Sequence, residues 1–181
     1  DETYQKVIIN NQEEVNIYSN KITLEIEALG GIDLVKTSDQ GDRLGNAEFE
    51  LRKDGAVIAT EKTNANGEIS FTDLEIGKYE LVEIKAPTGY ILNANPVVVD
   101  VVGGVHTPVN VTNNIIKGKV AVEKSDSEID TLKLQGAEFT IYNMLGDIVD
   151  TIITDENGYA ESKLFNYGNF VMWETGLPTG Y

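Results

Sequence analysis

The most informative absence in this 181-residue sequence is cysteine, of which there is none. The chain can therefore form no disulfide, no thiolate metal site and no cysteine nucleophile. Histidine is almost as scarce: the single His106, in an expected exposed loop before Pro108, gives no basis for a catalytic triad or a transition-metal site. We expect no metal, no cofactor and no turnover enzyme.

Positive charge and long apolar runs are also scarce. The 14 Lys and Arg residues face 30 Asp and Glu residues, and the net charge of −16 repels nucleic acid and anionic membranes. The most apolar run, residues 96–105, contains Asp100 and is too short to cross a bilayer, so no membrane insertion is expected. No apolar stretch keeps a helical period, whereas short runs rich in Val, Ile, Thr and Tyr alternate with turn residues. The sequence predicts an all-β fold.

What the chain does contain is an internal repeat. Residues 60–90 and 151–181 match without a gap at Asn-Gly, Leu, Gly, an aromatic residue, Glu and a closing Pro-Thr-Gly-Tyr. A repeat of about 90 residues predicts two small tandem domains. We assign residues 31–116 to a complete domain, and residues 117–181 to a second domain that lacks its own closing strands.

Residues 1–30 resemble the closing strands that the second repeat lacks. Strands are predicted over residues 4–9 and 17–27, and a Gly-Gly pair follows before the next repeat begins. Two interpretations stay open. In the first, the chain is part of a longer array of repeats, cut at the same point of a repeat at both ends. In the second, residues 1–30 complete residues 117–181, within one chain or between neighbouring chains by strand donation.

Each repeat also contains an Asn-Gly step, at Asn66-Gly67 and at Asn157-Gly158. The neighbouring Asn, Asp and Glu residues partly match a calcium loop, but the acidic spacing and the terminal Glu ligand of an EF-hand are missing. Asn-Gly between two strand-like runs is a strong signal for a β-hairpin. We therefore expect a hairpin in each repeat and no calcium.

Three polar residues are predicted to face the core of the first domain. Strand alternation places Lys36 on the same face as apolar positions 32 and 34, Glu83 with positions 79 and 81, and Asn113 with positions 109 and 111. An unpaired polar group buried in a core destabilises the fold, so the inward position of these three residues needs a chemical explanation. Asn110 and Asn114 are alternatives to Asn113, because a slip of one residue in register exchanges the two faces of a strand.

One chemical reason is an amide-forming reaction. Burial favours the neutral forms of lysine and glutamate side chains. A neutral Lys36 amine can attack the side-chain carbonyl carbon of Asn113, while a protonated Glu83 hydrogen-bonds the carbonyl oxygen and shuttles the proton that lets ammonia leave. The product is a Lys-Asn isopeptide crosslink, formed once and without an external enzyme. The alternative is an ordinary buried or snorkelling Lys-Glu ion pair.

These residues also carry a family resemblance. The pattern begins with a strand that contains Lys, followed by Leu-x-Asn/Gly-Ala-x-Phe, an Asn-Gly turn and Tyr-x-Leu-x-Glu-x-x-Ala-Pro-x-Gly-Tyr. It resembles the collagen-adhesin B-type (CnaB, SpaA-like pilin) repeat, well over residues 31–115 and in part over residues 117–181. The resemblance implies tandem immunoglobulin-like or transthyretin-like β-sandwiches, found in stalks, pilins and adhesins of Gram-positive cell surfaces. It also assigns the isopeptide roles to Lys36, Glu83 and Asn113.

The second repeat follows this pattern only in part. Lys124 and Glu174 match the crosslinking lysine and the promoting acid, but Gly176-Leu177 replaces the Lys-Ala of the first repeat and no Asn-bearing strand follows. The sequence identifies no crosslink partner for Lys124. Trp173 is predicted on the outer face of its strand, as an interdomain or donated-strand contact.

Taken together, these features predict an extracellular, structural cell-surface protein: a stalk, pilus or fibre repeat whose crosslink resists force and proteolysis, anchored to the cell wall through regions outside this sequence. The expected partners are adjacent repeats and neighbouring copies of the same protein. The alternative is an adhesin module that binds a host matrix protein or glycan through its loops.

Overall fold

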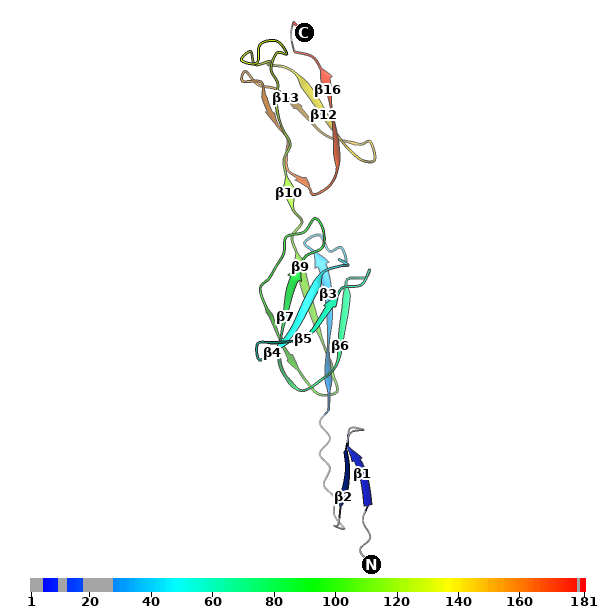
Figure 1. Cartoon of the computed structure of the whole chain (residues 1–181). Coiled ribbons are helices and arrows are strands. Elements are labelled where there is room, and N and C mark those ends of the chain that lie inside the picture. Colours follow the sequence, from blue (N-terminus) through cyan, green and yellow to red (C-terminus); the bar gives the residue numbers. More distant parts are fainter. Residues whose placement is uncertain (1–4, 10–12, 18–27, 179) are drawn as a thin grey trace, which may run out of the picture.

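The computed structural model describes residues 5–9, 13–17, 28–178 and 180–181, and the regular structure within these ranges is entirely β-strand. Two β domains follow one another along the chain, joined by a short linker (Figure 1). Among the described residues there is no helix long and apolar enough to span a membrane. The all-β prediction is confirmed.

Two short strands precede the domains. β1 (Gln5–Ile9) pairs with β2 (Glu13–Ile17) in an antiparallel two-stranded sheet. The predicted strand over residues 17–27 lies outside the described residues, apart from Ile17. Neither β1 nor β2 pairs with a strand of the second domain within the described part of the chain, so donation of these residues between chains stays a prediction.

The first domain is a sandwich of two sheets. The strands in one sheet run in the order β5 (Ala56–Lys62), β4 (Glu48–Lys53), β7 (Gly77–Lys85) and β8 (Val97–Val101), and those in the other in the order β6 (Glu68–Leu74), β3 (Gly30–Ser38) and β9 (His106–Asn113). Alternate residues of both sheets point inward, as the period of two predicts. They form a core that includes Ile32, Leu34, Phe49, Leu51, Tyr79, Leu81, Val109 and Val111.

The first and last strands of this domain lie side by side. β3 and β9 are parallel, with Lys36 opposite Val111 and Ser38 opposite Asn113. β9 is an edge strand, which explains how it accommodates Pro108, a residue that lacks a backbone donor. The parallel register brings the Lys36 end of β3 to the Asn113 end of β9.

The Asn-Gly steps are turns, but the predicted hairpins are wrong. β5 and β6 flank Gly67 and belong to different sheets, and the same holds for β13 (Ile148–Ile153) and β14 (Tyr159–Glu161) around Gly158. In the first turn the Asn64 side chain accepts hydrogen bonds from the backbone N–H groups of Asn66 and Glu68. This local bonding stabilises a bend without strand pairing, so each turn carries the chain from one sheet to the other.

Gly67 allows this turn to lie against the lysine strand. Its φ is +74°, and a Cβ there would lie 2.5 Å from the backbone oxygen of Lys36. We expect Gly67→Ala to destabilise the first domain by more than Gly104→Ala, because Gly104 has the same φ of +74° but open space around a Cβ. The positive φ alone accounts for about 1 kcal/mol in both variants. Chemical denaturation of the two variants measures the difference, and equal losses would contradict the steric argument.

The second domain is built from shorter strands. β12 (Glu138–Asn143) lies between β13 and β16 (Phe170–Gly176), β11 (Ala121–Glu123) pairs with β14, and β10 (Lys117–Gly118) pairs with β15 (Phe165–Asn166). Its core is smaller and contains Ala137, Phe139, Ile141, Ile152, Ala160 and Phe165. Strands equivalent to β8 and β9 are absent from the described residues of this domain.

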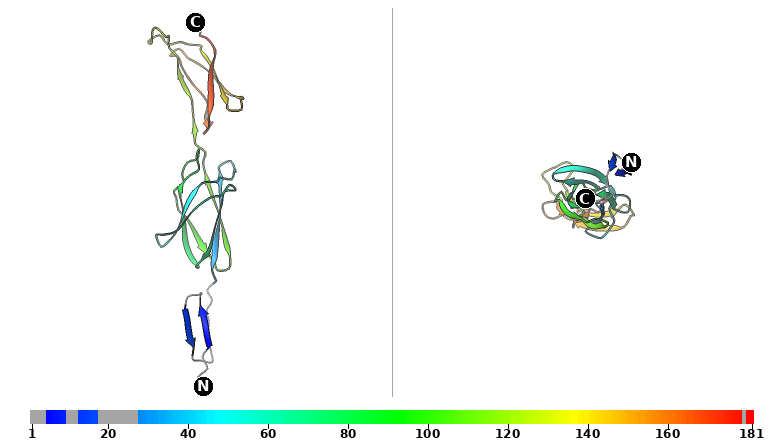
Figure 2. Two further views of the ribbon diagram at one scale, coloured as in Figure 1. Left: turned by 45° about the vertical axis from the view of Figure 1, so that its right-hand side comes forward. Right: turned by 90° about the horizontal axis from the view of Figure 1, so that it is seen from below.

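The linker between the domains is held by backbone hydrogen bonds on both sides. Ile116 donates to the carbonyl of Gly89 in the first domain and accepts from Tyr167 in the second, at 2.9 and 2.7 Å. The Tyr167 ring packs so closely on Gly89 that a Cβ on the glycine would lie 2.6 Å from it. Figure 2 shows the two domains following one another along a single axis.

Candidate functional site

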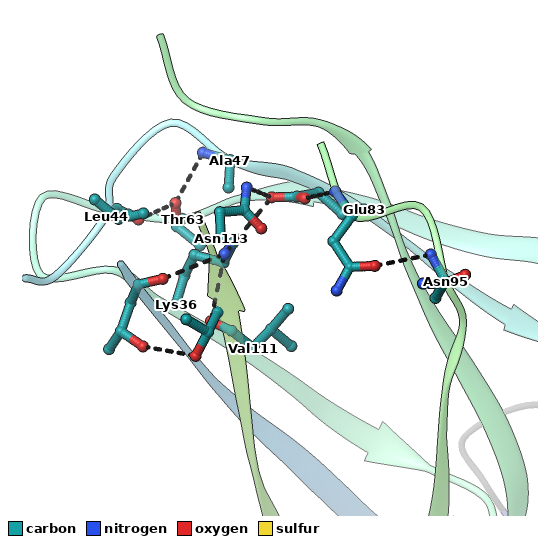
Figure 3. Close-up of polar contacts among 11 residues, drawn as sticks. Lys36, Leu44, Ala47, Thr63, Glu83, Asn95, Val111 and Asn113 are labelled. Carbon is teal, nitrogen blue, oxygen red and sulfur yellow. Dashed lines mark hydrogen bonds and ion pairs between the residues drawn. The ribbon is translucent and has the colours of Figure 1, made fainter. Parts of the chain in front are cut away.

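Three polar side chains lie inside the first domain at the end of the sandwich nearest the linker. Lys36 on β3, Glu83 on β7 and Asn113 on β9 are each no more than 1% exposed. β3 and β9 belong to one sheet and β7 to the other, so the side chains meet between the sheets (Figure 3). The sequence-based placement of all three on inward faces agrees with the burial of alternate residues along each strand.

One carboxylate oxygen connects the other two groups. Glu83 Oε1 lies 3.8 Å from Lys36 Nζ and accepts a hydrogen bond of 2.8 Å from Asn113 Nδ2. The amine that would attack and the amide nitrogen that would leave therefore share one neighbouring oxygen. A group in this position can accept a proton from one nitrogen and deliver it to the other.

The environment of Lys36 favours its neutral form. Burial lowers the pKa of the Lys36 amine, while the nearby Glu83 charge acts in the opposite direction with a smaller effect. The amine donates to the backbone carbonyl of Val111 at 3.3 Å, which fixes it beside β9. A lysine with a lowered pKa in a dry site is a competent nucleophile.

The amide of Asn113 is bonded through only one of its two ends. Nδ2 faces Glu83, and Oδ1 is buried with no hydrogen-bond donor among the described residues. We expected the carboxyl group to contact the carbonyl oxygen instead. The hydrogen bond present uses the NH2 group as donor, whereas a carboxyl group that carries a proton could donate to Oδ1 once the amide rotates by half a turn.

Two further groups hold the site, and neither was predicted from the sequence. The backbone N–H of Asn93 donates to Glu83 Oε2 at 2.9 Å, so both carboxylate oxygens are engaged. The buried hydroxyl of Thr63 donates to the Leu44 carbonyl and accepts from the Ala47 N–H, which fixes the chain beside Lys36. Which backbone N–H group of a loop reaches the carboxylate depends on the path of the loop in the tertiary structure, and not on the type of residue that carries the group.

The register of β9 separates the three candidate asparagines. Asn113 is buried, whereas Asn110 and Asn114 lie on the exposed face. Only Asn113 contacts Glu83. The two alternatives considered from sequence therefore point away from the lysine and the glutamate.

The second domain has a lysine and a glutamate in the same places, but no third group beside them in the described part of the chain. Lys124 Nζ lies 2.9 Å from Glu174 Oε2, and these side chains are 30% and 27% exposed, against none for Lys36 and Glu83. Trp173 lies on the outer face of β16, as predicted, but is 64% exposed and has no covering domain or strand in the described part of the chain.

No cluster of His, Asp and Glu suited to a metal ion occurs among the described residues. His106 is the first residue of β9 and not part of a loop, and its Nδ1 lies 3.0 Å from Asp33 Oδ1. Ser70 donates to the same Asp33 oxygen. This exposed group is a surface hydrogen-bonded cluster in which the serine faces the aspartate and not the imidazole, so it lacks the order of a catalytic triad.

The lowered pKa of Lys36 predicts a pH dependence in a protein that keeps the free amine. In Asn113→Ala the folded state binds fewer protons than the unfolded chain between the lowered pKa and the ordinary lysine value of 10.5. The free energy of unfolding should therefore rise with pH in this window. Denaturation at a series of pH values below 10.5 measures the slope. The Lys36→Met/Asn113→Ala double variant is the control and should lack this rise; equal slopes would contradict the assignment to Lys36.

Comparison with known proteins places the chain in a family. The model of the SpaA prealbumin-like fold domain matches residues 30–115 and again residues 118–181. Among solved structures, the Bacillus anthracis TIE protein is 31% identical with a TM-score of 0.80, over 93% of this chain and 33% of that one. A streptococcal ancillary pilin shares the fold, with 23% identity and a TM-score of 0.50, over 98% of this chain and 67% of that one.

The chain thus spans about a third of the Bacillus anthracis structure. No curated protein matches it. Because the family model matches most of the sequence in two consecutive segments, the predicted SpaA-like resemblance is confirmed, and the chain belongs to the SpaA prealbumin-like fold domain family.

Proposed function

We propose that this chain is a load-bearing part of a Gram-positive surface stalk or pilus, and that its first domain carries an autocatalytic isopeptide bond between Lys36 and Asn113. The observation that supports the bond most strongly is the shared oxygen of Glu83, which contacts both reacting nitrogens inside a dry core. A surface location and the lack of turnover activity belong to the same proposal, as does anchoring to the cell wall outside this sequence.

The reaction begins when one proton moves from Lys36 to Glu83, which turns a buried ion pair into a neutral amine and a neutral acid. The Lys36 Nζ lone pair attacks Cγ of Asn113, and the acid stabilises the oxygen that becomes negative. A proton from Nζ passes through the Glu83 carboxyl to Nδ2, the Cγ–Nδ2 bond breaks and ammonia leaves. The fold holds the groups together, which can remove about 7–11 kcal/mol from the barrier.

The position of the bond suits a mechanical role. The chain enters the first domain through β3 and leaves it through β9, and these strands lie side by side. A bond between Lys36 and Asn113 would carry force directly from the first strand to the last. The rest of the domain would then bear no load.

Peptide mapping tests the proposal at the level of residues. After proteolysis of the denatured chain, tandem mass spectrometry should find a branched peptide that joins the segment around Lys36 to the segment around Asn113. Recovery of both segments as separate linear peptides, with Asn113 intact, would contradict the crosslink and leave a buried ion pair.

A further inference from the structure

The buried glutamate of the first domain is held on one side by the loop that follows its own strand. Residues 86–96 connect β7 to β8, and within this loop the backbone N–H of Asn93 donates to Glu83 Oε2 at 2.9 Å. The other oxygen, Oε1, accepts from Asn113 Nδ2 at 2.8 Å and lies 3.8 Å from Lys36 Nζ. The carboxylate therefore lies between the two reacting groups and the loop that carries Asn95 (Figure 3).

The two oxygens of Glu83 face groups with different hydrogen-bonding capacities. A backbone N–H can only donate, so Oε2 has to direct a lone pair at Asn93. When the carboxyl group carries a proton, the arrangement that keeps this bond leaves Oε2 as the carbonyl oxygen and places the proton on Oε1. A proton on Oε2 would meet a second donor and would point away from both reacting nitrogens. One backbone group thus distinguishes a productive from an unproductive position of the proton.

The loop is bonded on both sides of the Asn93 donor. Before it, the Ile91 N–H donates to the carbonyl of Asn114 at 2.9 Å, and Asn114 directly follows the reacting Asn113. After it, the Asn95 N–H donates to the side-chain oxygen of Asn93 at 3.3 Å. The Asn93 side chain is partly exposed and is used within the loop, so only its backbone reaches the site. The donor and the reacting amide are therefore held by the same connected stretch of backbone.

We propose that the backbone N–H of Asn93 is a positioning group for the crosslink: because it bonds to Oε2 of Glu83, the proton that the reaction moves is carried on Oε1. Oε1 first takes a proton from Lys36 Nζ, whose lone pair then forms the Nζ–Cγ bond with Asn113. Oε1 gives its proton to Nδ2 and takes the second proton from Nζ, the Cγ–Nδ2 bond breaks with its electron pair on nitrogen, and ammonia leaves. The Asn93 bond is kept throughout. The inference rests on the reaction proposed for the first domain.

The test replaces this one N–H by an oxygen atom and keeps every side chain. Cell-free translation with a suppressor tRNA that carries the α-hydroxy analogue of asparagine gives the whole chain with an ester in place of the amide at Asn93. Samples are denatured at intervals after synthesis, and the intact mass gives the fraction of chains that have lost one ammonia. Removal of a hydrogen bond to a charged group should slow this loss by about tenfold relative to the parent.

Two matched controls isolate the backbone donor. The same ester at Asn95 removes an N–H that bonds to the Asn93 side chain and not to the carboxylate, so this chain should react at the parental rate. Asn93→Ala removes the side chain but keeps the backbone N–H, and it should also react at the parental rate. Hydrogen exchange of the Asn93 ester in an Asn113→Ala chain, which cannot react, should show the same protection of the first-domain core as Asn113→Ala alone.

The outcomes separate this inference from the proposed function. A parental rate for the Asn93 ester, an equal loss of rate in the Asn95 ester, or an equally slow Asn93→Ala variant would overturn the inference, while the parent would still form its bond. A first domain that loses its core protection with the ester at Asn93 would assign this N–H to the stability of the fold, and would overturn the inference as well. A folded parent that keeps its full mass would instead remove the crosslink itself, and the proposed function would fail with it.

Discussion

The Asn113→Ala variant is expected to melt about 15–30 °C below the parent in the transition of the first domain. A crosslink between residues 36 and 113 closes most of the domain into a loop, which in the chain-entropy account stabilises the folded state by about 4 kcal/mol. For a domain of this size each kcal/mol changes the melting temperature by about 4–8 °C. Differential scanning calorimetry measures the shift.

Two neighbouring asparagines provide matched controls. Asn110 and Asn114 are exposed residues of the same type within four positions of Asn113. Asn110→Ala and Asn114→Ala should therefore change the melting temperature by only a degree or two. A loss in Asn113→Ala no larger than in these controls would show that the buried amide contributes nothing covalent.

The second large effect concerns extension under force. When the parent is pulled from its ends, the segment between Lys36 and Asn113 should stay locked, because the bond transfers the load from β3 to β9 directly. In Asn113→Ala the same segment should unfold and release about 250 Å of contour length, at 3.3–3.6 Å per residue. Single-molecule force spectroscopy measures this length.

The second domain is an internal reference in that experiment. Among the described residues Lys124 faces no asparagine, so the unfolding step of this domain should appear in both proteins. A step of about 250 Å from the first domain of the parent would mean that no covalent connection joins β3 to β9.

The buried Lys36–Glu83 pair is difficult to explain as a stabilising ion pair alone. Two charges removed from water lose several kcal/mol of hydration each, about as much as their attraction returns. In the second domain the equivalent pair is partly exposed and closer, at 2.9 Å against 3.8 Å. The first domain therefore buries its lysine more completely while bonding it less well to the glutamate, an arrangement suited to a reaction in which both groups become neutral.

Strand alternation was sufficient to predict that three polar side chains face the core of the first domain. Lys36, Glu83 and Asn113 stand in runs whose neighbours at every second position are apolar, so their inward direction follows from the geometry of a strand. The internal repeat agrees with the two consecutive matches of the family model, since the Lys and Glu positions recur with the same flanking motif.

Features that depend on the packing of sheets were not predictable in the same way. Asn-Gly at Gly67 is a local signal for a turn, but whether the flanking strands pair with one another depends on partners elsewhere in the chain. The Asn93 N–H reaches Glu83 from a loop whose path no sequence pattern specifies. The direction of the Asn113 amide depends on the position of the Glu83 carboxyl oxygen that accepts from its NH2 group.

The most direct test of the central claim is the intact mass of the denatured parent beside that of Glu83→Ala. The proposal predicts that the parent is lighter than its calculated mass by one ammonia and that Glu83→Ala, which keeps Lys36 and Asn113 but has no proton carrier, has its full calculated mass. A folded parent of full mass would contradict the account, and Lys36, Glu83 and Asn113 would then be a noncovalent polar cluster.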